Sequence, residues 1–121
     1  MAQARSDVQY AVKELCRAMS RPTVSDVVAL KRLARYLTAH RRVRVHFRFQ
    51  EAVKAVKVWT GTDYAGCRKT RKSTSGGVLM LGSHQVKGWS TTQGVIALSS
   101  GEAEYYGMVK RGSIGLGMRS M

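Results

Sequence analysis

Two stretches near the start of the chain have the apolar spacing of amphipathic helices. Apolar side chains recur at i, i+3 and i+4 over residues 8–19 and again over residues 24–37. The single proline, Pro22, separates them, and Thr23 or Ser25 stands where a cap of the second helix belongs. The predicted core positions are Val8, Ala11, Val12, Leu15, Cys16 and Met19, then Val24, Val27, Val28, Leu30, Leu33, Ala34 and Leu37.

Strict alternation of apolar and polar residues predicts strands further along the chain. In residues 43–50, Val and Phe alternate with Arg, His and Gln, which is typical of a half-buried strand with a basic outer face. Three more strands are predicted over residues 53–60, 77–82 and 85–90. Ser99 and Glu102 have the spacing of a capping box, so a last helix is predicted from there, fraying among the glycines of residues 112–117. The pattern predicts an α+β fold, with a boundary between residues 1–50 and 51–121.

Charge narrows the partners that we expect. The chain has 21 Lys and Arg against 7 Asp and Glu, a net charge of +14, which attracts polyanions such as nucleic acid first and an anionic membrane surface second. No apolar run approaches the roughly 20 residues of a membrane span, and the first residues lack the apolar core of a secretory signal. We therefore expect an intracellular protein, cytoplasmic or nuclear, without a membrane partner. Cys16 is expected to be a buried thiol and Cys67 an exposed one, both reduced.

Several motifs of the second half occur together in one order. They are DYAG at 63–66, RKSTSG at 71–76, Trp89 and ALSSGEAEY at 97–105. They resemble the ribonuclease H region of copia-type retrotransposon Pol polyproteins, which typically reads S-D-A-D-W-A-G, four residues, R-K-S-T-S-G, then A-L-S-S-T-E-A-E-Y. The first half resembles the preceding end of the reverse transcriptase, through RSDVQYAV at 5–12, MSRPT at 19–23 and residues 29–37. The resemblance implies a partial ribonuclease H-like fold: a three-stranded antiparallel sheet followed by a helix, preceded here by two helices and the extra strand.

The family resemblance also implies a chemistry and its ligands. Such enzymes cleave the RNA strand of an RNA–DNA hybrid with two Mg²⁺ ions, which favour carboxylate oxygens. The resemblance places the first carboxylate at Gly61, the second at Glu104 and the third on a later strand, before which the sequence ends at Met121. Asp63 is a further candidate, but it lies about 6.6 Å along the strand from position 61, at roughly 3.3 Å per residue. We expect catalysis to be impaired and Mg²⁺ not to bind productively.

The loop after residue 63 suggests a second role. Its cations should repel Mg²⁺ and attract phosphate, and the hydroxyl and backbone N–H groups that follow can also contact phosphate. The candidate nucleic-acid-binding residues are Arg68, Lys69, Arg71, Lys72, Ser73, Thr74 and Ser75. The alternative is an ordinary solvated loop. Trp59 and Trp89 are expected in the core rather than as platforms for bases.

These observations favour a retrotransposon-derived, ribonuclease H-like chain that binds nucleic acid, either an RNA–DNA hybrid or another polyanion, without turnover. Three alternatives stay open. The first is an active nuclease completed by another chain. The second is an interaction protein that self-associates or binds a protein partner through an open sheet edge, since unpaired edges invite pairing. The third is a degenerate reading frame without function.

Overall fold

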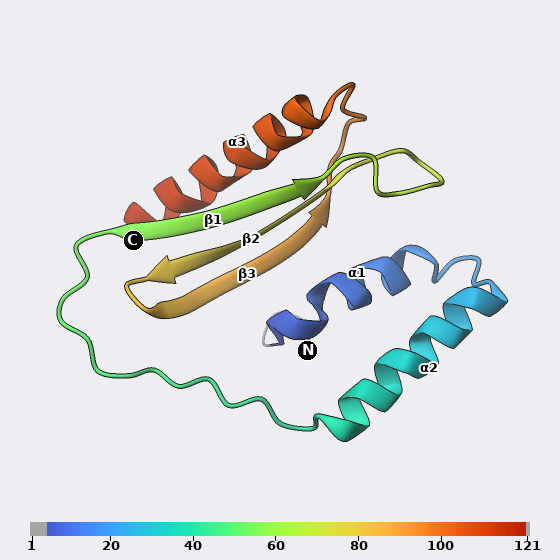
Figure 1. Ribbon diagram of the computed structural model, residues 1–121, viewed down its shortest axis with the longest axis horizontal. Helices are drawn as coiled ribbons and strands as arrows, with labels where there is room; N and C mark the ends of the chain where they lie inside the picture. Colours follow the sequence, from blue (N-terminus) through green and yellow to red (C-terminus); the bar gives the residue numbers. More distant parts are fainter. Residues whose placement is uncertain (1–4, 121) are drawn as a thin grey trace. The chain divides into compact units, whose positions relative to one another are not determined.

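The computed structural model describes residues 5–120, and the chain divides into two compact units, Met1–His46 and Phe47–Met121 (Figure 1). The first unit contains a 3₁₀ turn, Ser6–Val8, then helix α1, Gln9–Arg17, and helix α2, Val24–Ala39. Thr23 caps α2: its hydroxyl accepts the N–H of Asp26 at 3.4 Å, while the Asp26 carboxylate accepts the N–H of Thr23 at 2.8 Å. Both predicted helices are confirmed, and the cap is Thr23 rather than Ser25.

The interior of the helical unit is much smaller than the apolar spacing predicted. Among residues 5–46 only Val8 is buried, at 2% exposure. Val24 is 83% exposed and Leu30 55%, and the Cys16 side chain is exposed as well. The prediction that these apolar side chains form a core is therefore wrong for most of them, because two short helices bury only the strip along which they meet.

A polar cluster joins the start of the helical unit to α2. Arg5 donates to the Asp7 carboxylate from Nε at 2.9 Å and from Nη2 at 2.7 Å, and Tyr36 donates to the same carboxylate at 2.9 Å. Arg5 also donates to the carbonyl of His40 at 3.0 Å. The hydrogen bonds from Arg5, and then that from Tyr36, hold the pKa of Asp7 well below its usual range. The same Asp7–Tyr36 bond raises the pKa of Tyr36.

Acid is therefore expected to loosen the helical unit. Because the pKa of Asp7 is lower in the folded chain than in the unfolded one, its stabilising effect is complete above about pH 4 and is lost as the pH falls below that value. The helical signal in circular dichroism should decline in acid, and less so in an Asp7→Asn variant, which cannot titrate there. Glu51→Gln is the matched control, since Glu51 is an exposed carboxylate outside this cluster. Identical acid profiles for Asp7→Asn and the unmodified chain would refute the assignment.

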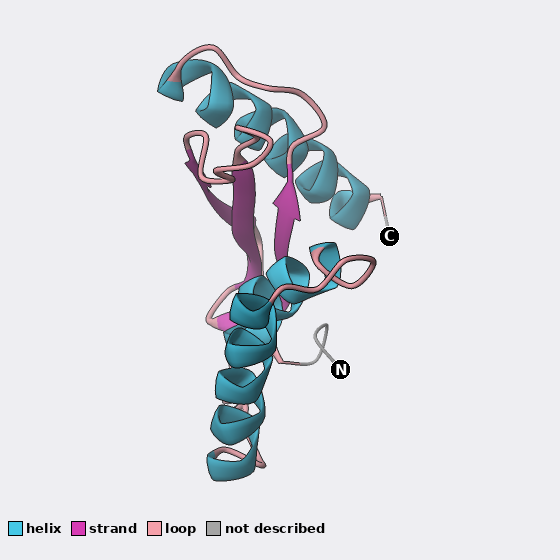
Figure 2. Ribbon diagram, turned by 90° about the vertical axis from the view of Figure 1, so that its right-hand side faces the viewer, coloured by secondary structure: helices cyan, strands magenta, loops and turns pink. Residues whose placement is uncertain are grey.

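The second unit is a three-stranded antiparallel sheet with a helix on one face. Strands β1, Val56–Asp63, β2, Thr74–Leu81, and β3, His84–Thr92, lie in the order β1-β2-β3. Helix α3, Ser100–Arg119, packs along β1 and β2 (Figures 1 and 2). This confirms the predicted α+β arrangement of a three-stranded antiparallel sheet followed by a helix. The pairings Val56 with Leu81 and Asp63 with Thr74 set the strand ends, which lie up to three residues from those predicted.

The core of this unit lies between the sheet and α3. Leu79, Trp89 and Ala103 are buried there. Burial alternates along β1, so that residues 56, 58, 60 and 62 face α3 and residues 57, 59, 61 and 63 do not. Trp59 is 64% exposed for this reason. The core prediction is confirmed for Trp89 and wrong for Trp59.

Residues 41–55 have no regular secondary structure, so the extra strand predicted over residues 43–50 is wrong. An alternating pattern becomes a strand only when a neighbouring backbone supplies the hydrogen bonds. Here the Gln50 side chain donates instead to the carbonyl of Leu81 at 3.0 Å and accepts from the N–H of Ser83 at 2.9 Å. The segment is thus held at the turn between β2 and β3 by a side chain rather than by strand pairing.

Helix α3 begins as predicted and ends later. Its cap is Ser99, whose hydroxyl accepts the N–H of Glu102 at 3.1 Å, and it continues through the glycines to Arg119. Gly115 lies against Val58 of β1, a contact that compensates for the low helix propensity of glycine. The expected fraying among these glycines is not seen, since the helix is continuous through them. No helix among residues 5–120 is both long and apolar enough to cross a membrane.

Candidate functional site

The family resemblance implies metal-ligand positions at Gly61, near the end of β1, and at Glu104, on α3, and the fold brings these two residues next to each other. Glu104 lies in the first turns of α3, and its Oε1 accepts the N–H of Thr62 at 3.2 Å. Thr62 directly follows Gly61. The carboxylate of Glu104 is therefore held against the backbone next to Gly61, which offers no side chain there.

The Asp63 carboxylate bonds at the base of the loop that follows β1, whereas the Glu104 carboxylate bonds to β1 itself. Its Oδ1 accepts the N–H of Thr74, and its carboxylate lies so close to Gly66 that a Cβ there would overlap it. This bond closes the loop between β1 and β2 at its base. The Asp63 carboxylate thus holds the loop closed.

These donors do not fit a two-magnesium centre. Within residues 5–120, no three His, Cys, Asp or Glu side chains gather closely enough to hold a metal ion. The two carboxylates at the strand end, Glu104 and Asp63, each already accept a backbone N–H. A pair of Mg²⁺ ions about 3.5–4 Å apart needs several carboxylate oxygens between them, and the strand end does not provide them.

The loop from residue 64 to residue 73 presents its cations outward. The N–H of Arg71 donates to the carbonyl of Cys67 at 2.7 Å, and the N–H of Cys67 donates to the carbonyl of Lys72 at 3.2 Å, so the loop has a defined backbone. Arg68, Lys69 and Arg71 are exposed, and no ion pair joins them to a carboxylate in the described part of the chain. Lys72 donates to the carbonyl of Gly94 at 2.6 Å. The loop thus carries four cationic residues on a defined backbone, three of them exposed and one, Lys72, half-buried and bonded to Gly94.

The three hydroxyl residues predicted to contact phosphate lie inside the unit. Ser73, Thr74 and Ser75 are all buried. The Ser73 hydroxyl accepts the N–H of Ala65 at 3.0 Å, and that of Ser75 accepts from Gln93 Nε2 at 2.9 Å. As placed, they bond to their own chain and do not face a ligand. A phosphate would meet Arg68, Lys69, Arg71 and Lys72 instead.

Arg71 occupies a backbone conformation that favours glycine, with φ at +56°. Replacing Arg71 with glycine should therefore raise the free energy of unfolding, by up to about 1 kcal/mol, measured by urea denaturation. Arg68→Gly removes the same charge from the same loop, but φ is not positive at residue 68. This control should therefore not raise the free energy of unfolding. A loss of stability in Arg71→Gly equal to that in Arg68→Gly would contradict the strain at Arg71.

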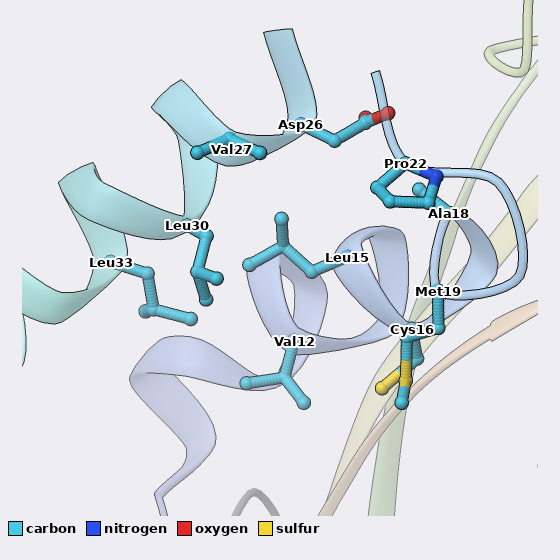
Figure 3. Close-up of a pocket in the computed structure, with 10 residues that line it drawn as sticks. All are labelled: Val12, Leu15, Cys16, Ala18, Met19, Pro22, Asp26, Val27, Leu30 and Leu33. Atoms are coloured by element: carbon cyan, nitrogen blue, oxygen red, sulfur yellow. The ribbon is translucent and has the colours of Figure 1, made fainter. Parts of the chain in front are cut away.

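A second surface feature belongs to the helical unit. An apolar groove of about 340 Å³ lies between α1 and α2, with Val12, Leu15 and Leu30 turned into it (Figure 3). Of its ten lining residues, the only charged one is Asp26, which is engaged in the cap with Thr23. Ligand sites combine apolar walls with a few convergent polar groups. This groove lacks the second component, so we assign no chemistry to it.

Comparison with known proteins identifies several that are similar to this chain in sequence. It is 34% identical over 103 residues to Uncharacterized mitochondrial protein AtMg00810 of Arabidopsis thaliana, covering 84% of this chain and 42% of that protein. It is 32% identical over 105 residues to the Retrovirus-related Pol polyprotein from transposon RE1 of Arabidopsis thaliana, covering 87% of this chain and 7% of the polyprotein. It is also 35% identical over 105 residues to Secreted RxLR effector protein 161 of Plasmopara viticola, covering 73% of that protein.

The chain belongs to the family that these proteins share, which includes retrotransposon Pol polyproteins. The relationship supports an origin in a transposon for this Pol-related chain. This chain spans less than half the length of AtMg00810 and a small part of the length of the Pol polyproteins. No profile of a known protein family matches the chain. No solved structure matches it either.

Proposed function

We propose that this Pol-related chain descends from a copia-type ribonuclease H region, binds nucleic acid through its cationic loop, and does not hydrolyse RNA–DNA hybrids. The observation that carries the proposal is the strand end itself. Glu104 lies at the backbone of Thr62, beside Gly61, while the next loop presents Arg68, Lys69, Arg71 and Lys72. Both carboxylates at this strand end, Glu104 and Asp63, already accept backbone N–H groups, and the four cations of the following loop favour holding a phosphate backbone over holding Mg²⁺.

Charge elsewhere on the chain supports the same partner. Residues 27–50 contain seven Lys and Arg and no Asp or Glu, and residues 64–101 contain five and none. The carboxylates are used for caps and loop closure, as with Asp26, Asp63 and Glu102. Contacts from Lys and Arg to phosphate supply affinity that is independent of sequence. We therefore propose binding to duplexes and hybrids without a preferred base sequence.

The loop can be tested by removing its charge. A triple variant, Arg68→Gln, Lys69→Gln and Arg71→Gln, should bind an RNA–DNA hybrid more weakly and flatten the dependence of log affinity on log salt by about one for each lost phosphate contact. The matched control is Lys31→Gln, Arg32→Gln and Arg35→Gln, which removes the same net charge from the exposed residues of α2. Fluorescence anisotropy measures both. Equal losses in the two triple variants would mean that net charge alone drives binding and that the loop is no site.

The absence of turnover is tested separately. When the chain is incubated with Mg²⁺ and a labelled RNA–DNA hybrid, the RNA strand should not be cleaved, even with the protein in excess over the hybrid. Cleavage that disappears in Glu104→Gln would show that Glu104 still holds a catalytic metal and would overturn this part of the proposal, in favour of an active nuclease. Binding of the hybrid, measured in the same samples, serves as the control for folding.

The free edge of β1 favours one second candidate, a protein interaction. Among residues 5–120, β1 pairs with β2 on one side and with no strand on the other. Since the N–H of Thr62 points away from β2 to Glu104, the N–H of Val58 points to the same open side. Val58→Pro would block strand addition there without removing a bond to β2. If the edge pairs with a second copy, light scattering should detect a dimer that Val58→Pro abolishes; a monomer at all concentrations would exclude self-association.

A further inference from the structure

We propose that Phe49 is a platform on which a base of single-stranded nucleic acid stacks, forming a second binding element distinct from the loop at residues 64–73. This rests on the proposed nucleic-acid binding and adds the class of strand that is preferred. The Phe49 ring is 97% exposed, the most exposed large apolar side chain among residues 5–120. Nothing in the described fold uses the ring, although its backbone neighbours on both sides are held in place.

The anchor on one side is Gln50. Its Nε2 donates to the carbonyl of Leu81 at 3.0 Å and to His84 Nδ1 at 3.1 Å, while its Oε1 accepts from Ser83 N–H at 2.9 Å and Ser83 Oγ at 3.0 Å. Gly82 makes room for it: φ there is +58°, and a Cβ would lie 2.3 Å from Gln50 Oε1. The amide of Gln50 is thus fully engaged with the turn between β2 and β3.

The anchor on the other side is His84. Its Nε2 lies 2.7 Å from the carbonyl of Arg48, which can only accept, and its ring packs edge to face with that of Phe47 at 5.1 Å between centroids. Phe49 therefore extends from a short stretch of backbone that is tied down at residues 48 and 50. Such a ring binds a flat partner with little loss of conformational freedom, because the backbone that carries it is already fixed.

The charges of the residues near Phe49 in sequence indicate the kind of partner that its ring would bind. Arg48, the residue before it, and Lys54, five residues after it, are exposed, and Glu51 is the one acid in residues 47–55. An exposed aromatic ring among cations is the arrangement by which proteins bind single strands, since the cations contact the backbone and the ring stacks on a base. In a duplex the base faces are already stacked inside the helix, so the ring can reach only a splayed base. The combination favours single-stranded RNA or DNA over an apolar protein partner.

The test uses the whole chain, a labelled oligouridine and a labelled duplex. Phe49→Leu keeps an apolar side chain but removes the ring face, so it should weaken binding to the single strand about 5-fold or more and leave duplex binding unchanged. Leu98→Ala is the control, since Leu98 is an 85% exposed apolar residue without a ring and its loss should change neither affinity. Gln50→Leu, which releases the anchor and keeps Phe49, should also weaken single-strand binding.

A second measurement reports stacking directly. In a Phe49→Trp variant, added oligouridine should quench indole emission beyond the change seen in the unmodified chain, whose tryptophans are Trp59 and Trp89. Unchanged single-strand affinity in Phe49→Leu, with duplex binding intact, overturns the platform and leaves the proposed function standing; it would point to a protein partner for this ring. Failure of the unmodified chain to bind either nucleic acid overturns the proposed function, and the platform with it.

Discussion

Raising the salt concentration from 50 to 200 mM is expected to weaken binding of an RNA–DNA hybrid roughly 100-fold, if the four loop cations each neutralise one phosphate. The loop places Arg68, Lys69, Arg71 and Lys72 on an ordered turn with no carboxylate among its own residues. Each neutralised phosphate releases condensed counterions, and this release becomes less favourable as salt rises. Affinity measured by fluorescence anisotropy at several salt concentrations gives the slope directly.

The same salt series needs a control for folding, because ionic strength also screens the self-repulsion of a chain with a net charge of +14. Circular dichroism over the same range should stay constant, which would assign the change in affinity to the interface. Affinity that is independent of salt would exclude electrostatic binding and with it the proposed function. A slope that matches a single contact would show that the loop does not engage the backbone as a unit.

The second large effect is expected on stability, when alanine replaces Gly77 and adds one methyl group to the sheet. Gly77→Ala should lower the free energy of unfolding of the sheet unit by about 3 kcal/mol. A Cβ at Gly77 would lie 2.2 Å from Cζ2 of Trp89 and 2.5 Å from the backbone oxygen of Trp59, and neither atom can move away freely. The Trp89 ring covers this glycine beneath α3, so the overlap would force the ring out of the core or separate β1 from β2. Urea denaturation followed by near-ultraviolet circular dichroism would measure both the cost and the tryptophan environment.

Gly61→Ala is the matched control for this prediction. Gly61 is also a glycine within the sheet, but a Cβ there would have nothing within 4 Å. Alanine should therefore cost nothing at this position and gain about 0.5 kcal/mol by restricting the unfolded chain. If Gly61→Ala and Gly77→Ala destabilise the protein equally, the packing of Trp89 against Gly77 is not the reason that position 77 requires glycine.

The sequence by itself determined those features that depend on neighbours along the chain. The helices were predictable because their hydrogen bonds join residues four apart, and because Thr23 and Ser99 mark their beginnings through local caps. The three strands of the sheet were predictable as alternating runs joined by polar turns, although their ends were not. The motifs singled out Gly61 and Glu104 from sequence, and it is the fold that brings Glu104 to the backbone of Thr62, next to Gly61.

Only the tertiary structure decided which apolar residues are buried and which polar groups are free. Residues 43–50 have the pattern of a strand, but pairing needs a partner from elsewhere, and Gln50 ties the segment to a turn instead. Trp59 is exposed and Ser75 is buried because strand register and the position of α3 select the covered face. Both depend on contacts between residues far apart in sequence, whose identity no local pattern carries.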